Sequence, residues 1–135
     1  MNKSLFIVGV GGHAKMASNI AEKKFNIKGY IVPKIDKTLY KKNIFLGRKI
    51  FEEKEFLDKF KETNVFIAVG ENTDRKKIYT KFQKQDYQFP NLIDDTAIIH
   101  KSVELGIGNI VMPNTVINSF SQIKNFTIIN TSSVI

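Results

Sequence analysis

Aliphatic residues recur at every sixth position over the last third of the chain. The series runs without a break through Ile99, Leu105, Val111, Ile117, Ile123, Ile129 and Ile135. A helix repeats about every 3.6 residues and a strand about every two, so neither produces this spacing. A left-handed parallel β-helix does, because each of its three faces takes about six residues and turns one apolar side chain inward.

The positions four residues after these aliphatic ones hold mostly small side chains, which fit the tight corners of such a coil. They are Thr115, Ser121, Thr127 and Ser133, with Val103 and Asn109 as less regular members. We therefore predict that residues 91–135 form the first coils of a left-handed parallel β-helix, about two in number and incomplete.

The chain before Pro90 has a different pattern, in which short apolar runs alternate with amphipathic segments. The apolar runs, residues 4–10, 27–32 and 64–69, are typical of buried strands. Helical periodicity covers residues 13–25, 52–62 and a segment that ends near Gln85, with a polar loop between residues 34 and 45. Such alternation indicates βαβ units and a parallel sheet. We expect an α/β, Rossmann-like domain over residues 1–90.

Composition places the chain among globular proteins, with 42% apolar and 25% charged residues. No apolar run approaches the roughly 18 residues that span a bilayer, and the start does not resemble a signal peptide. The sequence has no cysteine, which excludes disulfides and thiolate chemistry. We expect a cytoplasmic protein with no membrane association and no metal site.

The net charge of +8 favours anionic partners. Nineteen of the 21 basic residues are lysines, scattered along the chain, and the two arginines are Arg48 and Arg75. Because arginine is the residue that grips phosphates and bases bidentately, we expect no nucleic-acid partner. A solvated lysine surface and attraction of a phosphorylated small molecule are the two remaining interpretations.

A glycine-rich turn, GVGGHAK at residues 9–15, lies between the first predicted strand and the first predicted helix. Backbone N–H groups at such a helix start can hold a phosphate. The turn also satisfies the looser dinucleotide pattern G-x-G-x-x-A, but Val32-Pro33-Lys34 stands where that site needs an acidic residue. Tight strand–helix packing is the alternative role for these glycines. His13 is either a ligand contact or a surface residue that begins the helix.

The glycine turn on a small βαβ domain, followed by hexapeptide repeats, resembles one family. It is that of the bacterial sugar acetyltransferases of the sialic-acid and bacillosamine type (NeuD/PglD-like). Residues 66–72 and 75–79 look like this family's third strand, ligand loop and next helix. Residues 89–93 resemble its linker, and residues 128–135 resemble the segment that enters its active site.

The resemblance implies that the N-terminal domain holds a UDP-linked amino sugar, and that the β-helix forms a homotrimer with acetyl-CoA between subunits. The residues implied to touch the nucleotide sugar are Gly11, Gly12, His13, Gly70, Glu71 and Asn72. Asn118 is implied to position groups near the reacting end, as are Asn130 and Thr131. The pathway implied is surface-glycan biosynthesis.

The family's catalytic histidine follows the segment that here ends the sequence at Ile135. We therefore expect no catalytic residue within these residues, because His100 is predicted to be a corner residue about two coils away. The resemblance therefore implies the substrate-binding part of an acetyltransferase, without turnover. The alternative is a non-catalytic module for nucleotide or dinucleotide binding or for assembly. Pro33 and Lys34 replace the family's acidic residues, so the nucleotide itself stays open.

Overall fold

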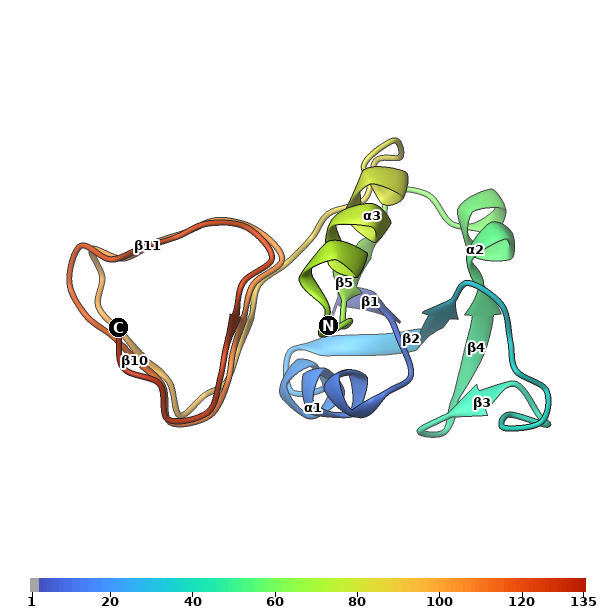
Figure 1. Cartoon of the computed structure of the whole chain (residues 1–135), viewed down its shortest axis with the longest axis horizontal. Coiled ribbons are helices and arrows are strands. Elements are labelled where there is room, and N and C mark those ends of the chain that lie inside the picture. The colour runs from blue at the N-terminus through green and yellow to red at the C-terminus, as the bar shows by residue number, and fades with distance from the viewer. Residues whose placement is uncertain (1–2) are drawn as a thin grey trace. The chain divides into compact units, whose positions relative to one another are not determined.

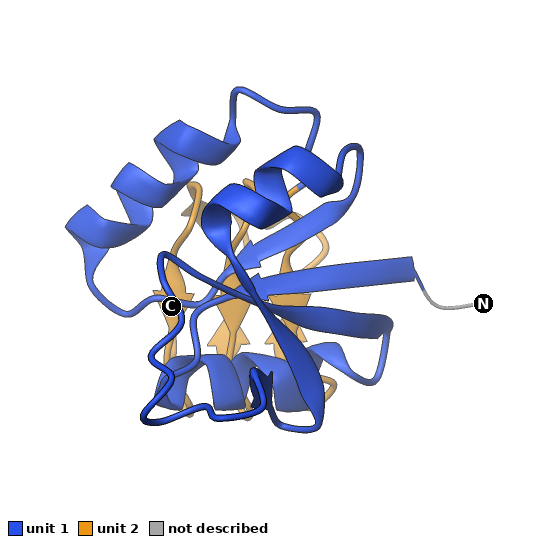
Figure 2. Cartoon of the chain, turned by 90° about the vertical axis from the view of Figure 1, so that its right-hand side faces the viewer, with its two compact units in different colours: residues 1–88 blue, residues 89–135 orange. Residues whose placement is uncertain are grey.

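The computed structural model describes residues 3–135, which divide into two compact units (Figure 2). Unit 1 extends to Gln88, and unit 2 runs from Phe89 to Ile135. No helix among the described residues is long and apolar enough to cross a membrane.

Unit 1 is a five-stranded sheet with helices on both faces (Figures 1 and 2). Its elements are β1 (Lys3–Val8), α1 (Gly12–Ala21), β2 (Phe25–Val32), β3 (Ile44–Phe45), β4 (Arg48–Glu52), α2 (Glu53–Lys59), β5 (Asn64–Ile67) and α3 (Asn72–Phe82). The strand order is β3-β4-β2-β1-β5, and every pair is parallel except β3 with β4.

Side chains that alternate along the central strands pack against helices on opposite faces of the sheet. Tyr30 of β2 is fully buried, and its hydroxyl lies 2.8 Å from the hydroxyl of Ser18 on α1. On the other face, Phe6 of β1 packs its ring against Phe56 of α2 and against Phe60, at centroid distances of 4.8 and 4.7 Å. Burial of these aromatic rings anchors α2, which has only seven residues.

The β3–β4 hairpin was not expected from the sequence. The sequence predicts a polar loop over residues 34–45 and a helix over residues 52–62, with no strand between them. Ile50 and Phe51 are both buried, so β4 lacks the alternation that marks a half-exposed strand. Its place depends on Gly29 of β2, where an added Cβ would lie 2.7 Å from the Phe51 ring. That close approach is tertiary and leaves no local signal.

Unit 2 is built of short parallel strands whose partners lie 18 residues apart. They are β6 (Leu92–Ile93), β7 (Ile98–Ile99), β8 (Glu104–Leu105), β9 (Ile110–Val111), β10 (Val116–Ile117), β11 (Gln122–Ile123) and β12 (Ile128–Ile129). Val116 pairs with Ile98, Gln122 with Glu104 and Ile128 with Ile110. The chain traces triangular coils in Figure 1, as expected for the start of a parallel β-helix.

The sixfold aliphatic series forms the core of these coils. Val111, Ile117, Ile123 and Ile129 are buried together, and Ile93, Ile99 and Leu105 pack against them. Corner residues with positive φ recur at the same six-residue interval: Gly108, Asn114, Phe120, Phe126 and Ser132. Both patterns confirm the fold class predicted from the sequence.

Side chains at the corners tie each coil to the next. The Asn114 amide donates to Thr96 Oγ1 (2.8 Å), and the Phe120 amide donates to Ser102 Oγ (2.9 Å). Asn109 is fully buried; its Oδ1 accepts from the Thr127 amide at 2.7 Å. Each of these bonds spans 18 residues, so small polar side chains at the corners fix the coil length.

Candidate functional site

The strand order has a switch point at β1 and β5, which are paired neighbours in the sheet. The chain passes from β1 through α1 to β2 on one side, whereas β5 pairs with the other side of β1. In open α/β sheets, such a switch point places ligands at the carboxyl ends of the two strands. The loops that meet there are the glycine turn after β1 and residues 68–71 after β5.

Gly9 has a structural reason to be glycine. Its φ of +116° disfavours L side chains, and an added Cβ would lie 2.6 Å from the carbonyl oxygen of Ala68. Its amide donates to the Ile31 carbonyl at 2.9 Å. Gly9 therefore brings the glycine turn against the loop after β5.

Packing does not explain the other glycines of the two loops. An added Cβ on Gly11, Gly12 or Gly70 would meet nothing within 4 Å, and none of the three has a left-handed φ. Gly11 and Gly12 are exposed at the start of α1, and Gly70 is exposed after β5. The absence of side chains leaves open space in front of both loops.

The N-terminus of α1 presents backbone donors to this space. Its N-cap is Gly11, no side chain caps it, and its first turn contains no acidic residue. Unpaired N–H groups and the helix dipole make such an end attractive to an anion.

His13 lies in the first turn of α1. Its Nε2 is buried and has no hydrogen-bond partner among the described residues. Burial lowers the pKa of His13, and the nearby Arg75 guanidinium lowers it further. The imidazole is therefore held neutral near pH 7, with one nitrogen able to donate and the other to accept.

The loop after β5 is organised by Arg75 of α3, which sequence reasoning did not place in the site. This side chain is buried, and its Nη1 donates to the carbonyl oxygens of Val69 (3.0 Å) and Gly70 (2.7 Å). Its Nη2 donates to Asn72 Oδ1. Burial lowers the pKa of Arg75, and the negative charge of Glu71 offsets part of this shift.

A cavity of about 360 Å³ lies at the same edge of the sheet, on the α2 and α3 side. Lys81 Nζ lies 3.1 Å from Glu53 Oε1 at its rim. Sequence reasoning missed these residues because the approach of α2 to α3 is a tertiary feature. The lining residues are Val8, Gly9, Ile31, Pro33, Glu53, Val69, Asp74, Lys77, Ile78 and Lys81.

The candidate residues therefore fall into two groups. Gly11, Gly12, His13, Gly70, Glu71 and Asn72 lie on the two loops at the carboxyl edge of unit 1. Asn118, Asn130 and Thr131 are exposed on unit 2, where Asn118 Nδ2 donates to the Ile135 carbonyl at 3.0 Å. His100 is also exposed there, with Nδ1 2.8 Å from Ser102 Oγ.

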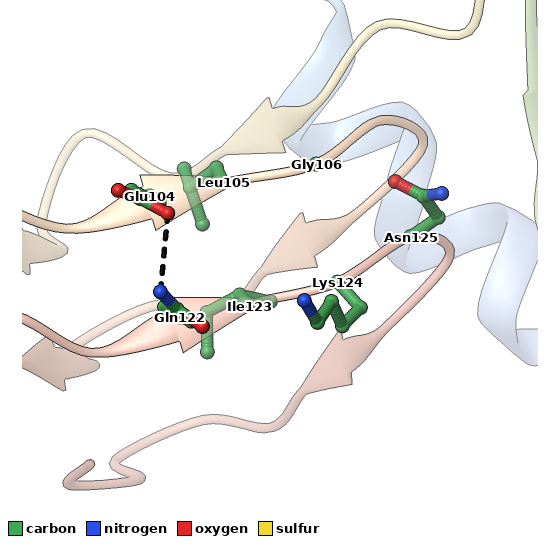
Figure 3. A pocket seen from close by; sticks show the side chains of 7 residues that line it. All are labelled: Glu104, Leu105, Gly106, Gln122, Ile123, Lys124 and Asn125. Carbon is green, nitrogen blue, oxygen red and sulfur yellow. Dashed lines mark hydrogen bonds between the residues drawn. The ribbon is translucent and has the colours of Figure 1, made fainter.

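Unit 2 has a shallow hollow of about 230 Å³ between β8 and β11 (Figure 3). Gln122 Nε2 donates to Glu104 across it at 3.3 Å, and Asn125 Oδ1 accepts from the Ile107 amide at 2.9 Å. These polar groups bond to one another or to the backbone, so the hollow is a weak candidate for chemistry.

No cluster of three metal-ligating side chains exists among residues 3–135.

The PglD N-terminal domain matches residues 4–82, which is more than half of this 135-residue chain. The chain belongs to this family. PerB from Caulobacter crescentus, solved with CoA and GDP-perosamine, is 26% identical with a TM-score of 0.83. That match covers 98% of this chain and 62% of PerB.

The acetyltransferase domain of PglB from Neisseria gonorrhoeae, solved with acetyl coenzyme A, has the same fold. It is 23% identical with a TM-score of 0.86, and the match covers 100% of this chain and 65% of that one. This PglD-family chain thus spans less than two thirds of either protein. The matches confirm the resemblance to NeuD/PglD-like sugar acetyltransferases.

Proposed function

We propose that unit 1 binds the nucleotide of a nucleotide-linked amino sugar, and that the whole protein transfers an acetyl group from acetyl-CoA to that sugar. The observation that supports this most is the open space before Gly11, Gly12 and Gly70, beside an uncapped helix N-terminus. Of the two roles considered for the glycine turn, packing explains Gly9 and phosphate binding explains the others.

The charge distribution supports an anionic ligand on unit 1. Residues 1–88 contain nineteen basic and ten acidic side chains, whereas residues 89–135 contain two and three. The excess positive charge of the chain therefore belongs to unit 1, where it raises the local concentration of a diphosphate. We propose that backbone donors of α1 hold the phosphates and that neutral His13 hydrogen-bonds the ligand.

Uracil and guanine are the two candidate bases of the ligand. The resemblance implies uridine, and PerB was solved with a GDP-linked sugar. A dinucleotide is less well supported, because Asp36, the nearest acidic residue after β2, lies in an exposed loop. Its Oδ1 already accepts from the Thr38 amide (2.9 Å) and hydroxyl (2.6 Å).

For acetyl transfer, we propose that the residues of this chain supply substrate binding and that the general base lies elsewhere in the protein. His100 is exposed on a corner and bonds to Ser102, and His13 belongs to the nucleotide loops. A general base contributes roughly 10²–10⁴-fold to such a reaction. Asn118 is proposed to position groups near the reacting end. A cytoplasmic location and a role in surface-glycan biosynthesis are part of this proposal.

We also propose that unit 2 assembles with further copies of the chain into a homotrimer. Ile98, Val116 and Val134 stack on the outer side of one face, and Ile98 and Val134 are 66% and 73% exposed. Phe120, at the adjoining corner, is 83% exposed. An exposed apolar column of this kind is typical of an interface.

Calorimetric titration of the 135-residue protein with UDP, GDP and NAD tests the binding proposal. We expect UDP or GDP to bind with a 1:1 stoichiometry and NAD to bind far more weakly. Binding of NAD alone would support the dinucleotide alternative, and binding of none would overturn the proposal. Acetyl transfer catalysed by these 135 residues would refute the proposal that the general base lies elsewhere in the protein.

A further inference from the structure

Arg75 lies in the first turn of α3, directly after the loop that follows β5. Its guanidinium donates to that loop. Nη1 contacts the carbonyl oxygens of Val69 and Gly70, and Nη2 contacts the side-chain oxygen of Asn72. These three acceptors belong to the segment that connects β5 to α3, so the guanidinium holds that segment.

We propose that Arg75 is a positioning residue of the nucleotide cleft, which holds residues 69–72 in the shape that faces the glycine turn. The proposal rests on the proposed nucleotide binding by unit 1. Three acceptors on one short loop meet one buried planar fork, whose fixed donor geometry differs from that of a compact ammonium group.

The loop has few other restraints. Gly70, Glu71 and Asn72 are exposed, Gly70 lacks a side chain, and no side chain caps the N-terminus of α3. Glycine also has more backbone freedom than any other residue. Without the guanidinium, two carbonyl oxygens would lose their bonds and the loop would sample other shapes.

The charge of Arg75 also acts on the other loop. Its positive charge acts on His13 of the glycine turn, and the pKa of His13 is lowered in part by it. The same side chain therefore fixes the shape of one loop and disfavours a second positive charge on the other.

The test compares Arg75→Lys and Arg75→Gln with wild type, using UDP or GDP, whichever wild type binds. If the free loop keeps its binding shape about a tenth of the time, the affinity falls about ten-fold. A positioning role predicts equal weakening by Lys and Gln, because neither forms the fork. An affinity close to wild type for Arg75→Lys would show that the charge alone acts on phosphate and would overturn the proposal.

Backbone ¹⁵N order parameters provide a readout that global destabilisation would not move. We expect lower values confined to residues 69–72 in both free variants, and recovery at saturating nucleotide. Unchanged order parameters would also overturn the proposal. If wild type binds neither nucleotide, the proposed function fails, while the order parameters still decide the role of Arg75 in the loop.

Arg48→Lys is the matched control. Arg48 Nη1 donates to the Leu46 carbonyl at 3.3 Å, and its Nη2 lies 3.8 Å from Glu22. None of these partners belongs to the two loops, so this variant should leave both the nucleotide affinity and the order parameters of residues 69–72 unchanged.

Discussion

Replacing Gly12 with alanine should raise the stability of unit 1 and weaken its nucleotide binding. Gly12 is the first residue of α1, and an added Cβ would meet no atom within 4 Å. Alanine restricts the unfolded chain, so at a compatible site it stabilises by about 0.4–1 kcal/mol. For a unit of this size, the unfolding midpoint rises by roughly 2–8 °C.

The same methyl group should obstruct the ligand. It would occupy the space before the α1 donors, and a phosphate held by those N–H groups needs that space. We expect the nucleotide affinity of Gly12→Ala to fall at least about ten-fold. Calorimetric titration measures this affinity, and thermal unfolding of the same preparation measures its stability. A gain in stability together with a loss of nucleotide affinity would show that Gly12 serves ligand binding and not the packing of unit 1.

Gly9→Ala is the control at the same turn. Its Cβ would lie 2.6 Å from the Ala68 carbonyl at a φ of +116°, so this variant should lose at least about 1 kcal/mol of stability. If Gly12→Ala binds nucleotide as wild type does, or is destabilised as Gly9→Ala is, the assignment of open space to a ligand is wrong.

Three further outcomes are expected. Because the folded-state pKa of His13 is lowered, the unfolded chain binds more protons there, and stability is lost as the pH falls below about 6.5. Urea unfolding between pH 7 and 5.5 should show a smaller loss in His13→Gln, and an equal loss would contradict this. Phe56→Ala should cost about 3–5 kcal/mol by chemical denaturation, since Phe56 is fully buried in the aromatic core; a cost under about 1 kcal/mol would refute that packing. Ile98→Glu should convert the expected trimer to monomers in light scattering, whereas Glu104→Lys on the polar face should not; a monomeric wild type would refute the interface.

The β-helix could be predicted from the sequence because its core is a local repeat. Each inward residue follows the previous one by six positions, so the pattern is visible in the sequence itself. Most of the βαβ alternation was visible for the same reason. β4 was missed because Ile50 and Phe51 are buried by β2 and α2, which only the folded sheet brings together.

The candidate site was predicted in part. The glycine turn and the loop after β5 carry sequence signals, and the structure brings them to one edge of the sheet. The bonding of Arg75 to this loop could not be predicted from the sequence, because two of its acceptors are the backbone carbonyl oxygens of Val69 and Gly70. Glu53 and Lys81 were missed because their ion pair joins α2 to α3, two helices far apart in the chain.

The constant 18-residue spacing between bonded corners has a consequence for the order of folding. In unit 2, every new coil pairs with the one completed 18 residues earlier, so the loop-closure entropy is the same at each step. In unit 1, β1 must wait for β5, because Leu5 pairs with Asn64. On a ribosome, unit 2 can therefore wind one turn at a time as it emerges, while the sheet of unit 1 closes only after some sixty residues have been made.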